Sequence, residues 1–496
     1  MPRSLTANVV ANSAGAVVNA LSGLVTAAYL LRQLGVNEFG TWALVVSTTS
    51  LLWLLDLGMT VAVGRLIAAQ RANDNVAEIS RILTTAVAVL GACCLAIVLV
   101  SWFMPWAFNA FFQMPPEKAP DVARAVWLMG LASAIHFVAA PYTCFLWGYE
   151  RFDLMNSVEI PSMLLRLAML FVFVGAGSAI WVIAACTLFT GCLAAVGYMV
   201  TSFVLERRLS LRPGLFKIRI AAQIIRTGLE FAVMNGTRSL VLQLPPIIIG
   251  YTLGTGSVAI FSIARQLSTN CNSFVSAATE AVAARSVQLF QVDAEVDQRR
   301  LLLMGGRYNA ALSCFLTFGL LLMGDSFIHL WQGGRAPGAY EQLTILLAGE
   351  FFALSQWTTF WVIMGMRMQR ALTLFSAGEG LTILAASALL VGFWGLAGIA
   401  VAAAVAAALW RGVAPLFYGF RLLNVPVREY ASQVVLPNLI VSLPAVMIGY
   451  AIDHWLQPRD WTTLILAAIF YAAAFAALLY PAMRGEPQMM APASEN

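Results

Sequence analysis

Apolar runs long enough to cross a bilayer recur along the whole chain. A helix needs about 20 predominantly apolar residues to span the hydrocarbon core, and fourteen runs of roughly that length can be drawn. They cover residues 9–31, 41–63, 83–106, 124–147, 157–175, 180–203, 222–250, 257–282, 303–323, 342–365, 371–392, 396–418, 433–452 and 461–480. The pattern predicts an all-α membrane protein with about 14 transmembrane helices.

The composition excludes an ordinary soluble protein. Of the 496 residues, 60% are hydrophobic and 11% are charged, and the mean hydropathy is +0.81, whereas about a quarter of the residues in soluble domains are charged. All 7 cysteines lie inside the apolar runs, where they are expected to pack as small apolar side chains rather than to form disulfides or bind a metal. The net charge of +5 comes from the loops and favours contact with anionic membrane lipids over nucleic acid.

Lysine and arginine are distributed unequally between alternate loops. Of the 29 such residues, eighteen fall in loops on one side of the membrane and five in loops on the other. Cytoplasmic loops carry the excess of positive charge, so both termini are predicted to be cytoplasmic. The remaining six lie inside predicted spans, and they are Arg166, Arg226, Arg238, Arg265, Arg307 and Arg411.

The chain contains an internal repeat. Leu34-Gly35 matches Leu253-Gly254, and Arg81 and Arg151 match Arg300 and Arg370 at the same spacing. Six helices, an even number, separate the copies, so the repeat predicts two six-helix lobes related by a pseudo-two-fold axis along the membrane normal. The predicted domains are an N-terminal lobe (1–204), a basic cytoplasmic linker (205–221), a C-terminal lobe (222–420), and two extra helices with a cytoplasmic tail (421–496).

Two adjacent predicted spans between Arg226 and Arg285 each carry a polar face with an arginine in it. At the helical period, these faces include Asn235, Arg238 and Gln243 on the first helix, and Arg265 and Asn272 on the second.

A cation that faces lipid at the bilayer centre costs at least about 2.5 to 3.5 kcal/mol, so Arg238 and Arg265 should face protein or a water-filled cavity. One interpretation is a positively charged cavity that binds an anionic cargo. The other is that each arginine pairs with a carboxylate, such as Glu230, Glu280 or Glu350, and only holds helices together.

Other spans carry polar residues that would extend such a cavity. The first span has a stripe of polar residues that includes Asn12 and Asn19, which forms either the wall of a hydrophilic path or a polar helix-helix seam. Arg166, in the span 157–175, is a third candidate for the cavity wall.

Three carboxylates inside the spans, Asp56, Glu350 and Glu379, are candidates for binding a coupling H⁺ or Na⁺. Each has a structural alternative, because membrane carboxylates often pair with a cation or a helix end. For Asp56 the alternatives are Arg65 or a helix end, and for Glu350 and Glu379 they are Arg265, Arg307 or Arg411. For His136 a hydrogen-bonded packing role is favoured over a proton relay. The pair Pro245-Pro246 predicts a kink or a broken helix.

Several glycine-rich segments together resemble one family. They are Leu34-Gly35 with Phe39-Gly40, Asp56-Leu57-Gly58 with Arg65, Gly148-Tyr149-Glu150-Arg151-Phe152, Ile249-Gly250 with Leu253-Gly254, and Gly395-Leu396-Ala397-Gly398. Their order and spacing are similar to those of bacterial polysaccharide, or O-antigen, flippases, which belong to the superfamily of the multidrug and toxin extruders (MATE) and the lipid II flippase. One departure is Gln243-Leu244-Pro245-Pro246, which stands where many relatives carry an aspartate.

The resemblance implies a MATE-like fold with a central cavity. The residues themselves predict no catalytic site, metal or cofactor. The resemblance also implies transport of an undecaprenyl-diphosphate-linked oligosaccharide, an O-antigen or exopolysaccharide repeat unit, from the cytoplasmic to the periplasmic leaflet of the bacterial inner membrane by alternating access. Basic cavity residues would bind the diphosphate, and a polysaccharide polymerase and other assembly proteins would be partners.

Two other functions are compatible with parts of the sequence. A cation-coupled multidrug exporter usually carries cationic cargo, so a positively charged cavity argues against it. A membrane-embedded glycan polymerase or glycosyltransferase would need catalytic carboxylates and usually a large periplasmic loop. The sequence has no paired acids of that kind, and its longest outer loops, near 107–122 and 324–341, are short.

Overall fold

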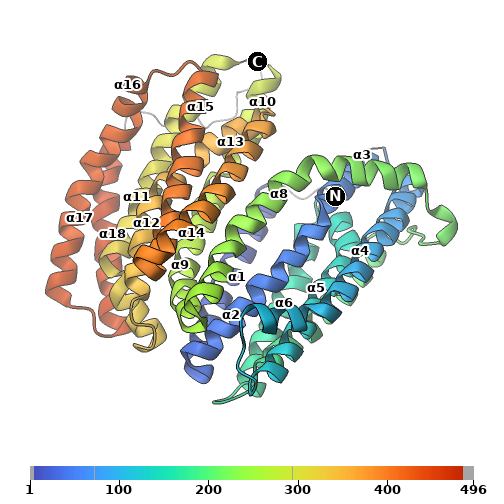
Figure 1. The fold of residues 1–496 in the computed structure, drawn as a ribbon. Helices are drawn as coiled ribbons and strands as arrows, with labels where there is room; N and C mark the ends of the chain where they lie inside the picture. Colours follow the sequence, from blue (N-terminus) through green and yellow to red (C-terminus); the bar gives the residue numbers. More distant parts are fainter. Residues whose placement is uncertain (1–4, 72, 293, 484–496) are drawn as a thin grey trace. The chain divides into compact units, whose positions relative to one another are not determined.

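The computed structural model describes the backbone of residues 5–71, 73–292 and 294–483. Within these ranges, the side chains of residues 5–17, 230, 231, 233–235, 284, 482 and 483 lie outside the described set. Every element in the described ranges is helical, and none is a strand. The predicted all-α fold class is confirmed (Figure 1).

The chain divides into two compact units. Unit 1 consists of Met1–Ile263 and Ile383–Leu396, and unit 2 consists of Ala264–Thr382 and Ala397–Asn496. The lobes and linker predicted from the repeat are defined by sequence rather than by contacts, and their boundaries stay a prediction.

Unit 1 contains α1 to α8, two short η segments, the start of α9, and residues Ile383–Leu396 from the middle of α14 (Gln369–Ala407). Before α14, its elements are α1 (Leu5–Leu34), α2 (Val36–Ser50), η1 (Leu51–Asp56), α3 (Met59–Arg71), α4 (Val76–Phe111), α5 (Ala119–Gly148), α6 (Phe152–Phe173), α7 (Ile180–Leu205), η2 (Pro213–Leu215), α8 (Ile218–Leu253) and the first turns of α9 (Thr255–Thr279). Helix α5 packs against α3, α4 and α7. Its fully buried Phe137 and Phe145 belong to the same apolar core as Ile67 of α3 and Leu83 of α4.

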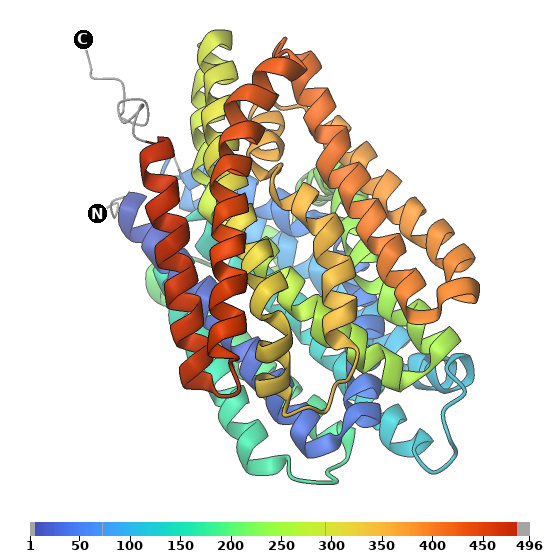
Figure 2. The ribbon, with the colours of Figure 1, turned by 90° about the vertical axis from the view of Figure 1, so that its left-hand side faces the viewer.

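Unit 2 contains the remainder of α9 and most of the C-terminal half of the chain. Its elements are α10 (Ala281–Gln291), α11 (Glu295–Gln332), α12 (Ala339–Leu354), α13 (Trp357–Gly365), most of α14 (Gln369–Ala407), η3 (Ala408–Val413), α15 (Ala414–Leu422), α16 (Val427–Tyr430), η4 (Ala431–Val435), α17 (Leu436–Leu456) and α18 (Trp461–Met483). Figure 2 shows α17 and α18 side by side, and both pack against α11. The buried Tyr471 of α18 joins this contact, because its ring stacks on Phe315 with centroids 5.4 Å apart and its hydroxyl donates to the Phe315 carbonyl.

Many of these helices are long and apolar enough to cross a membrane. Nine helical stretches meet that criterion within the described ranges. One of them, Gln369–Leu422, has 54 residues, enough for two crossings, and Gly395 departs from helical geometry inside it with φ 55°. The fourteen predicted runs all fall mainly on helical backbone, but the count of fourteen stays a prediction.

Large apolar side chains are exposed on the outside of these helices. On α4, Leu95, Trp102, Phe103 and Trp106 are 67%, 69%, 69% and 79% exposed. Contiguous apolar surface of this kind is rare on soluble monomers, and tryptophan is enriched where membrane helices meet the head groups. These helices identify an integral membrane protein.

Two turns occupy equivalent places in the predicted repeat and share one backbone conformation. Gly35, between α1 and α2, has φ 81° and ψ 173°, and Gly254, between α8 and α9, has φ 81° and ψ 175°. Only glycine adopts this region without strain. The matching turns support the repeat locally, while the two-lobe symmetry stays a prediction.

Helix α8 continues through Pro245 and Pro246, and both prolines are buried. Of the two expectations for this pair, the broken helix is therefore wrong. The two missing N–H donors do not interrupt a 36-residue helix, since the turns on either side remain hydrogen-bonded.

Candidate functional site

An ion network around Arg411 lies in unit 2. The Arg411 guanidinium contacts Glu350 of α12 through both terminal nitrogens, with Nη1 donating to Oε2 at 3.1 Å and Nη2 to Oε1 at 2.5 Å. Its Nε donates to Oε1 of Glu379, on α14, at 2.7 Å. One guanidinium therefore engages carboxylates from two different helices, and bidentate pairs of this kind are the stronger charge-assisted hydrogen bonds.

Glycines beside these charges allow the helices to approach closely. A Cβ on Gly349, next to Glu350, would lie 2.0 Å from the Ala404 carbonyl oxygen of α14. A Cβ on Gly378, next to Glu379, would lie 2.6 Å from the ring of Trp410, whose Nε1 donates to Oγ1 of Thr382 at 2.8 Å. The segment that carries Trp410 and Arg411, η3, is π-helical, a local geometry that is frequent at functional sites.

Arg265 lies near this network without joining it. Asn272 of α9 donates from Nδ2 to Glu350 Oε2 at 3.2 Å, and Arg265 lies about two turns earlier on the same helix. Arg265 is half-buried and within electrostatic range of Glu350, Glu379 and Arg411. It nevertheless forms no hydrogen bond, and no ion pair within 4.0 Å, with any residue that the structure describes.

The placement of Glu350 and Glu379 favours their structural alternative. Among the cations considered for them, the structure places Arg411 at both carboxylates. A coupling role for either residue would require the ion pair with Arg411 to open first.

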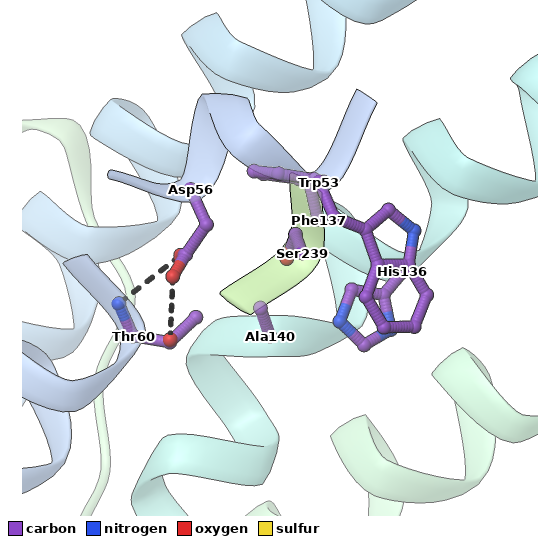
Figure 3. Close-up of a pocket in the computed structure, with 7 residues that line it drawn as sticks. All are labelled: Trp53, Asp56, Thr60, His136, Phe137, Ala140 and Ser239. Atoms are coloured by element: carbon purple, nitrogen blue, oxygen red, sulfur yellow. Dashed lines mark hydrogen bonds between the residues drawn. The ribbon is translucent and has the colours of Figure 1, made fainter. Parts of the chain in front are cut away.

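A second site is a small cavity of about 190 Å³ inside unit 1 (Figure 3). Its lining comes from four elements: Trp53 and Asp56 from η1, Thr60 from α3, His136, Phe137 and Ala140 from α5, and Ser239 from α8. It combines one carboxylate, one imidazole and two hydroxyls with apolar walls, and it has room for several waters.

Asp56 caps the helix that follows it. Its Oδ1 accepts from the Thr60 backbone N–H at 3.2 Å and its Oδ2 accepts from Thr60 Oγ1 at 2.9 Å. The chain can turn back in this way because Leu57 and Gly58 take left-handed φ values of 45° and 72°. The helix-end alternative for Asp56 is thus the one observed, and no ion pair links Asp56 to another described residue.

His136 packs differently from the expected hydrogen-bonded arrangement. Its ring lies flat on Trp53, with centroids 4.5 Å apart and an interplanar angle of 7° (Figure 3). No hydrogen bond joins His136 to another residue in the described part of the chain, because the stacked ring faces the indole and the cavity.

The other predicted cargo residues are dispersed over both units. In unit 1, Arg238 is exposed and Gln243 half-buried on α8, Arg166 is half-buried on α6, and Asn19 is exposed on α1. The Nε of Arg166 is buried and has no hydrogen-bond partner among the described residues. In unit 2, Arg265 and Asn272 lie together with the Arg411 network. The side chains of Asn12 and Asn235 lie outside the described residues.

Sequence reasoning missed two features of these sites. The sequence suggested Arg411 only as one of three pairing partners for the glutamates. The signal that could have singled it out is the repeated Gly-Glu dipeptide, at 349–350 and 378–379, because each glycine allows another helix to pack close to the glutamate beside it. Sequence reasoning also did not join Trp53, His136 and Ser239 to Asp56. The spacing of Trp53 and Asp56, about one helical turn, was a signal for that grouping.

The fold is similar to that of several solved membrane transporters. An inward-facing MATE family multidrug resistance transporter of the MOP superfamily matches with a TM-score of 0.71 at 11% identity, covering 83% of this chain and 94% of that chain. The lipid II flippase MurJ, in an inward closed conformation, matches with a TM-score of 0.70 at 12% identity, covering 96% of this chain and 100% of that chain. The protein therefore shares the fold of these transporters, and the predicted MATE-like fold is confirmed.

Sequence comparison is more specific than the fold. The family described as polysaccharide biosynthesis protein matches residues 5–284, more than half of the chain, and the chain belongs to this family. A relative from Shigella flexneri, described as "Putative O-antigen transporter", is 22% identical over 408 residues, which cover 80% of this chain and 94% of the relative. The resemblance stated from the glycine-rich segments is confirmed.

Proposed function

We propose that this protein is a flippase for a lipid-linked oligosaccharide. The cargo is an undecaprenyl-diphosphate-linked O-antigen or exopolysaccharide repeat unit, which moves from the cytoplasmic to the periplasmic leaflet of the bacterial inner membrane by alternating access. Family membership, the O-antigen relative and the likeness to a lipid II flippase support this proposal. In this orientation both termini are cytoplasmic, and the protein is a transporter rather than an enzyme.

The observation that carries the proposal is Arg265. A cation inside a membrane helix normally pairs with a neighbouring acid or faces water. Arg265 is half-buried and lies within electrostatic range of two carboxylates, yet it forms no ion pair with a described residue. A guanidinium in this state is well suited to a diphosphate, which it can bind through charge-assisted hydrogen bonds.

Other polar residues predicted from the sequence are further candidates for contacting the cargo, each within its own unit. In unit 1, Arg166 and Arg238 are candidates for the diphosphate, and the buried Nε of Arg166 is a donor that still lacks a partner among the described residues. Amides match the hydroxyl groups of a sugar because they both donate and accept hydrogen bonds. The amides assigned to this role are Asn12, Asn19, Asn235, Gln243 and Asn272.

Coupling to H⁺ or Na⁺ is part of the proposal, and Asp56 is the candidate that the contacts favour. Glu350 and Glu379 are less suited to bind an ion, because both are paired with Arg411. Asp56 lines a cavity with polar groups, and the side-chain hydrogen bond that it accepts comes from the Thr60 hydroxyl rather than from a cation. Asp56→Asn should make transport in proteoliposomes insensitive to an imposed H⁺ or Na⁺ gradient. Unchanged sensitivity to both gradients would remove Asp56 from this role.

The main experiment measures glycan export in a strain that depends on this gene. Arg265→Ala and Arg238→Ala are each expected to abolish surface polysaccharide, while immunoblots show an unchanged protein level. Arg370→Ala is the matched control, because it removes one positive charge from an exposed position at the start of α14.

Normal surface polysaccharide in both arginine variants would contradict the assignment of these residues to the cargo. Increased susceptibility to cationic drugs on deletion, with polysaccharide intact, would instead favour a multidrug exporter. Anionic membrane lipids, a polysaccharide polymerase and other assembly proteins are the partners that follow from the proposed role.

A further inference from the structure

Two carboxylates lie within electrostatic range of Arg265, and either could pair with it. Glu350 and Glu379 carry two negative charges, and Arg265 and Arg411 carry two positive charges, so the four groups can pair in more than one way. In the observed arrangement Arg411 takes both carboxylates and Arg265 takes neither. There are enough carboxylates for both arginines, but Arg411 pairs with both of them, and this leaves Arg265 without a direct ion pair.

Arg411 holds both carboxylates through direct hydrogen bonds. All three guanidinium nitrogens donate, two to Glu350 and one to Glu379. The fork of an arginine matches a carboxylate in this bidentate way and a single point charge does not. Asn272 adds a fourth hydrogen bond, from Nδ2 to the same Glu350 oxygen that accepts from Arg411 Nη1. Glu350 is therefore held by two neighbours, Arg411 and Asn272, and not by Arg265.

We propose that Arg411 is a positioning residue, which holds Glu350 and Glu379 and thereby keeps the Arg265 guanidinium available to the anionic group of the cargo. This inference rests on the proposed function, because it assigns a role inside the same site. Arg411 is not the cargo ligand in this arrangement, since its nitrogens are already engaged by the two carboxylates.

Removal of Arg411 should leave the carboxylates of Glu350 and Glu379 without their present partner. With Arg411→Gln, the cluster keeps two acids and one base, and Arg265 is the cation of the cluster that remains within electrostatic range of both acids. A buried carboxylate that loses its partner is strongly unfavourable, so one of the two is expected to pair with Arg265. The cargo anion would then have to displace an internal ion pair.

The test compares binding of undecaprenyl diphosphate to purified variants by native mass spectrometry, with undecaprenol as the uncharged control lipid and inorganic pyrophosphate as competitor. Arg265→Ala and Arg411→Gln should each weaken diphosphate binding about 10- to 100-fold, the range for loss of hydrogen bonds to a charged group. Undecaprenol binding should not change. Arg370→Gln, which removes an exposed positive charge from the same unit, should bind as the unmodified protein does.

The decisive variant is the triple substitution Arg411→Gln, Glu350→Gln and Glu379→Gln. It removes Arg411 together with the two acids that would capture Arg265, so binding should return to within about 3-fold of the unmodified protein. A purely structural role for Arg411 does not predict this rescue. If Arg411→Gln does not fold, the double variant Glu350→Gln and Glu379→Gln tests whether the two acids are themselves needed for diphosphate binding. It should bind at least as tightly as the unmodified protein.

The outcomes separate the inference from the proposed function. Full binding by Arg411→Gln, or a folded triple variant that fails to bind, would overturn the positioning role while leaving the flippase proposal intact. Loss of binding in the folded double variant would overturn it as well. Full binding by Arg265→Ala would overturn both, because Arg265 would then not contact the diphosphate.

Discussion

The close approach of α12 to α14 gives a direct test of how the Arg411 network is built. Gly349 lies where a Cβ would meet the backbone of Ala404, 2.0 Å from its oxygen and 2.4 Å from its carbonyl carbon. Real Cβ contacts below 3.0 Å are essentially never observed. Gly349→Ala therefore has to move two helix backbones apart by about 1.0 Å, from 2.0 to 3.0 Å.

The expected cost follows from packing and from the neighbouring ion pair. Adding a methyl group to a tightly packed contact costs about 1–3 kcal/mol, because the backbone has to shift. The shift would also carry Glu350 away from Arg411 Nη2, which lies 2.5 Å from its oxygen. An increase of about 1 Å would bring this contact to the limit of hydrogen-bonding distance. Gly349→Ala should thus lower both stability and diphosphate binding.

The measurement is unfolding in mixed micelles of dodecyl maltoside and sodium dodecyl sulfate, followed by tryptophan fluorescence. Gly91→Ala on α4 is the matched control, since nothing lies within 4 Å of a Cβ at that position. Alanine is preferred to glycine in a helix by about 1 kcal/mol, so the control should be as stable as the unmodified protein or more so. Equal stability of the two variants would show that α12 and α14 are not held in close contact.

Two further predictions concern residues outside the charged network. Tyr29→Phe removes the hydrogen bond from the Tyr29 hydroxyl to the buried Val174 carbonyl at 2.6 Å. This substitution should lower the unfolding free energy by about 1 kcal/mol. The control Tyr450→Phe, at a residue that is 65% exposed, should leave the unfolding free energy unchanged. Hydrogen bonds from Arg208 lower the pKa of Glu206 below its ordinary value of 4.5. A depressed carboxyl pKa stabilises the fold above pH 4.5, and this contribution is lost as the pH falls through the folded-state pKa. The unfolding free energy of the unmodified protein should accordingly exceed that of Glu206→Gln at neutral pH, and this difference should shrink as the pH drops below 4.5. A difference that stays constant with pH would contradict the role of the Glu206–Arg208 ion pair.

The features that could be predicted from the sequence are those that depend on neighbouring residues along the chain. Helical backbone under the apolar runs and the glycine turns at Gly35 and Gly254 follow from local hydrophobicity and local steric limits. The helix end at Asp56 is equally local, because its partner Thr60 is only one turn away. The uninterrupted helix at Pro245-Pro246 was not predictable, since tertiary packing around two buried prolines decides whether a helix continues.

The partners of the buried charges depend instead on which helices meet. Glu350, Glu379 and Arg411 lie in three separate sequence regions, and nothing in their own neighbourhoods selects Arg411 over Arg265 or Arg307. The selection comes from the glycine contacts that bring α12, α14 and η3 together. For the same reason, the stacking of His136 on Trp53 could not be predicted from either residue alone.

The observed pairing also changes the electrostatic argument for an anionic cargo. Six arginines inside the predicted spans indicated a strongly positive cavity, but Arg411 is neutralised by direct contact and contributes little to it. At an effective dielectric constant of about 20, unit charges attract by about 4 kcal/mol at 4 Å and half as much at twice that distance. Carboxylates held near Arg265 but out of contact with it can therefore stabilise this cation while leaving its hydrogen-bond donors open. A site of this kind needs no net positive charge to bind a diphosphate. The diphosphate would bind to the guanidinium whose hydrogen-bond donors are still open, which is that of Arg265 and not that of Arg411.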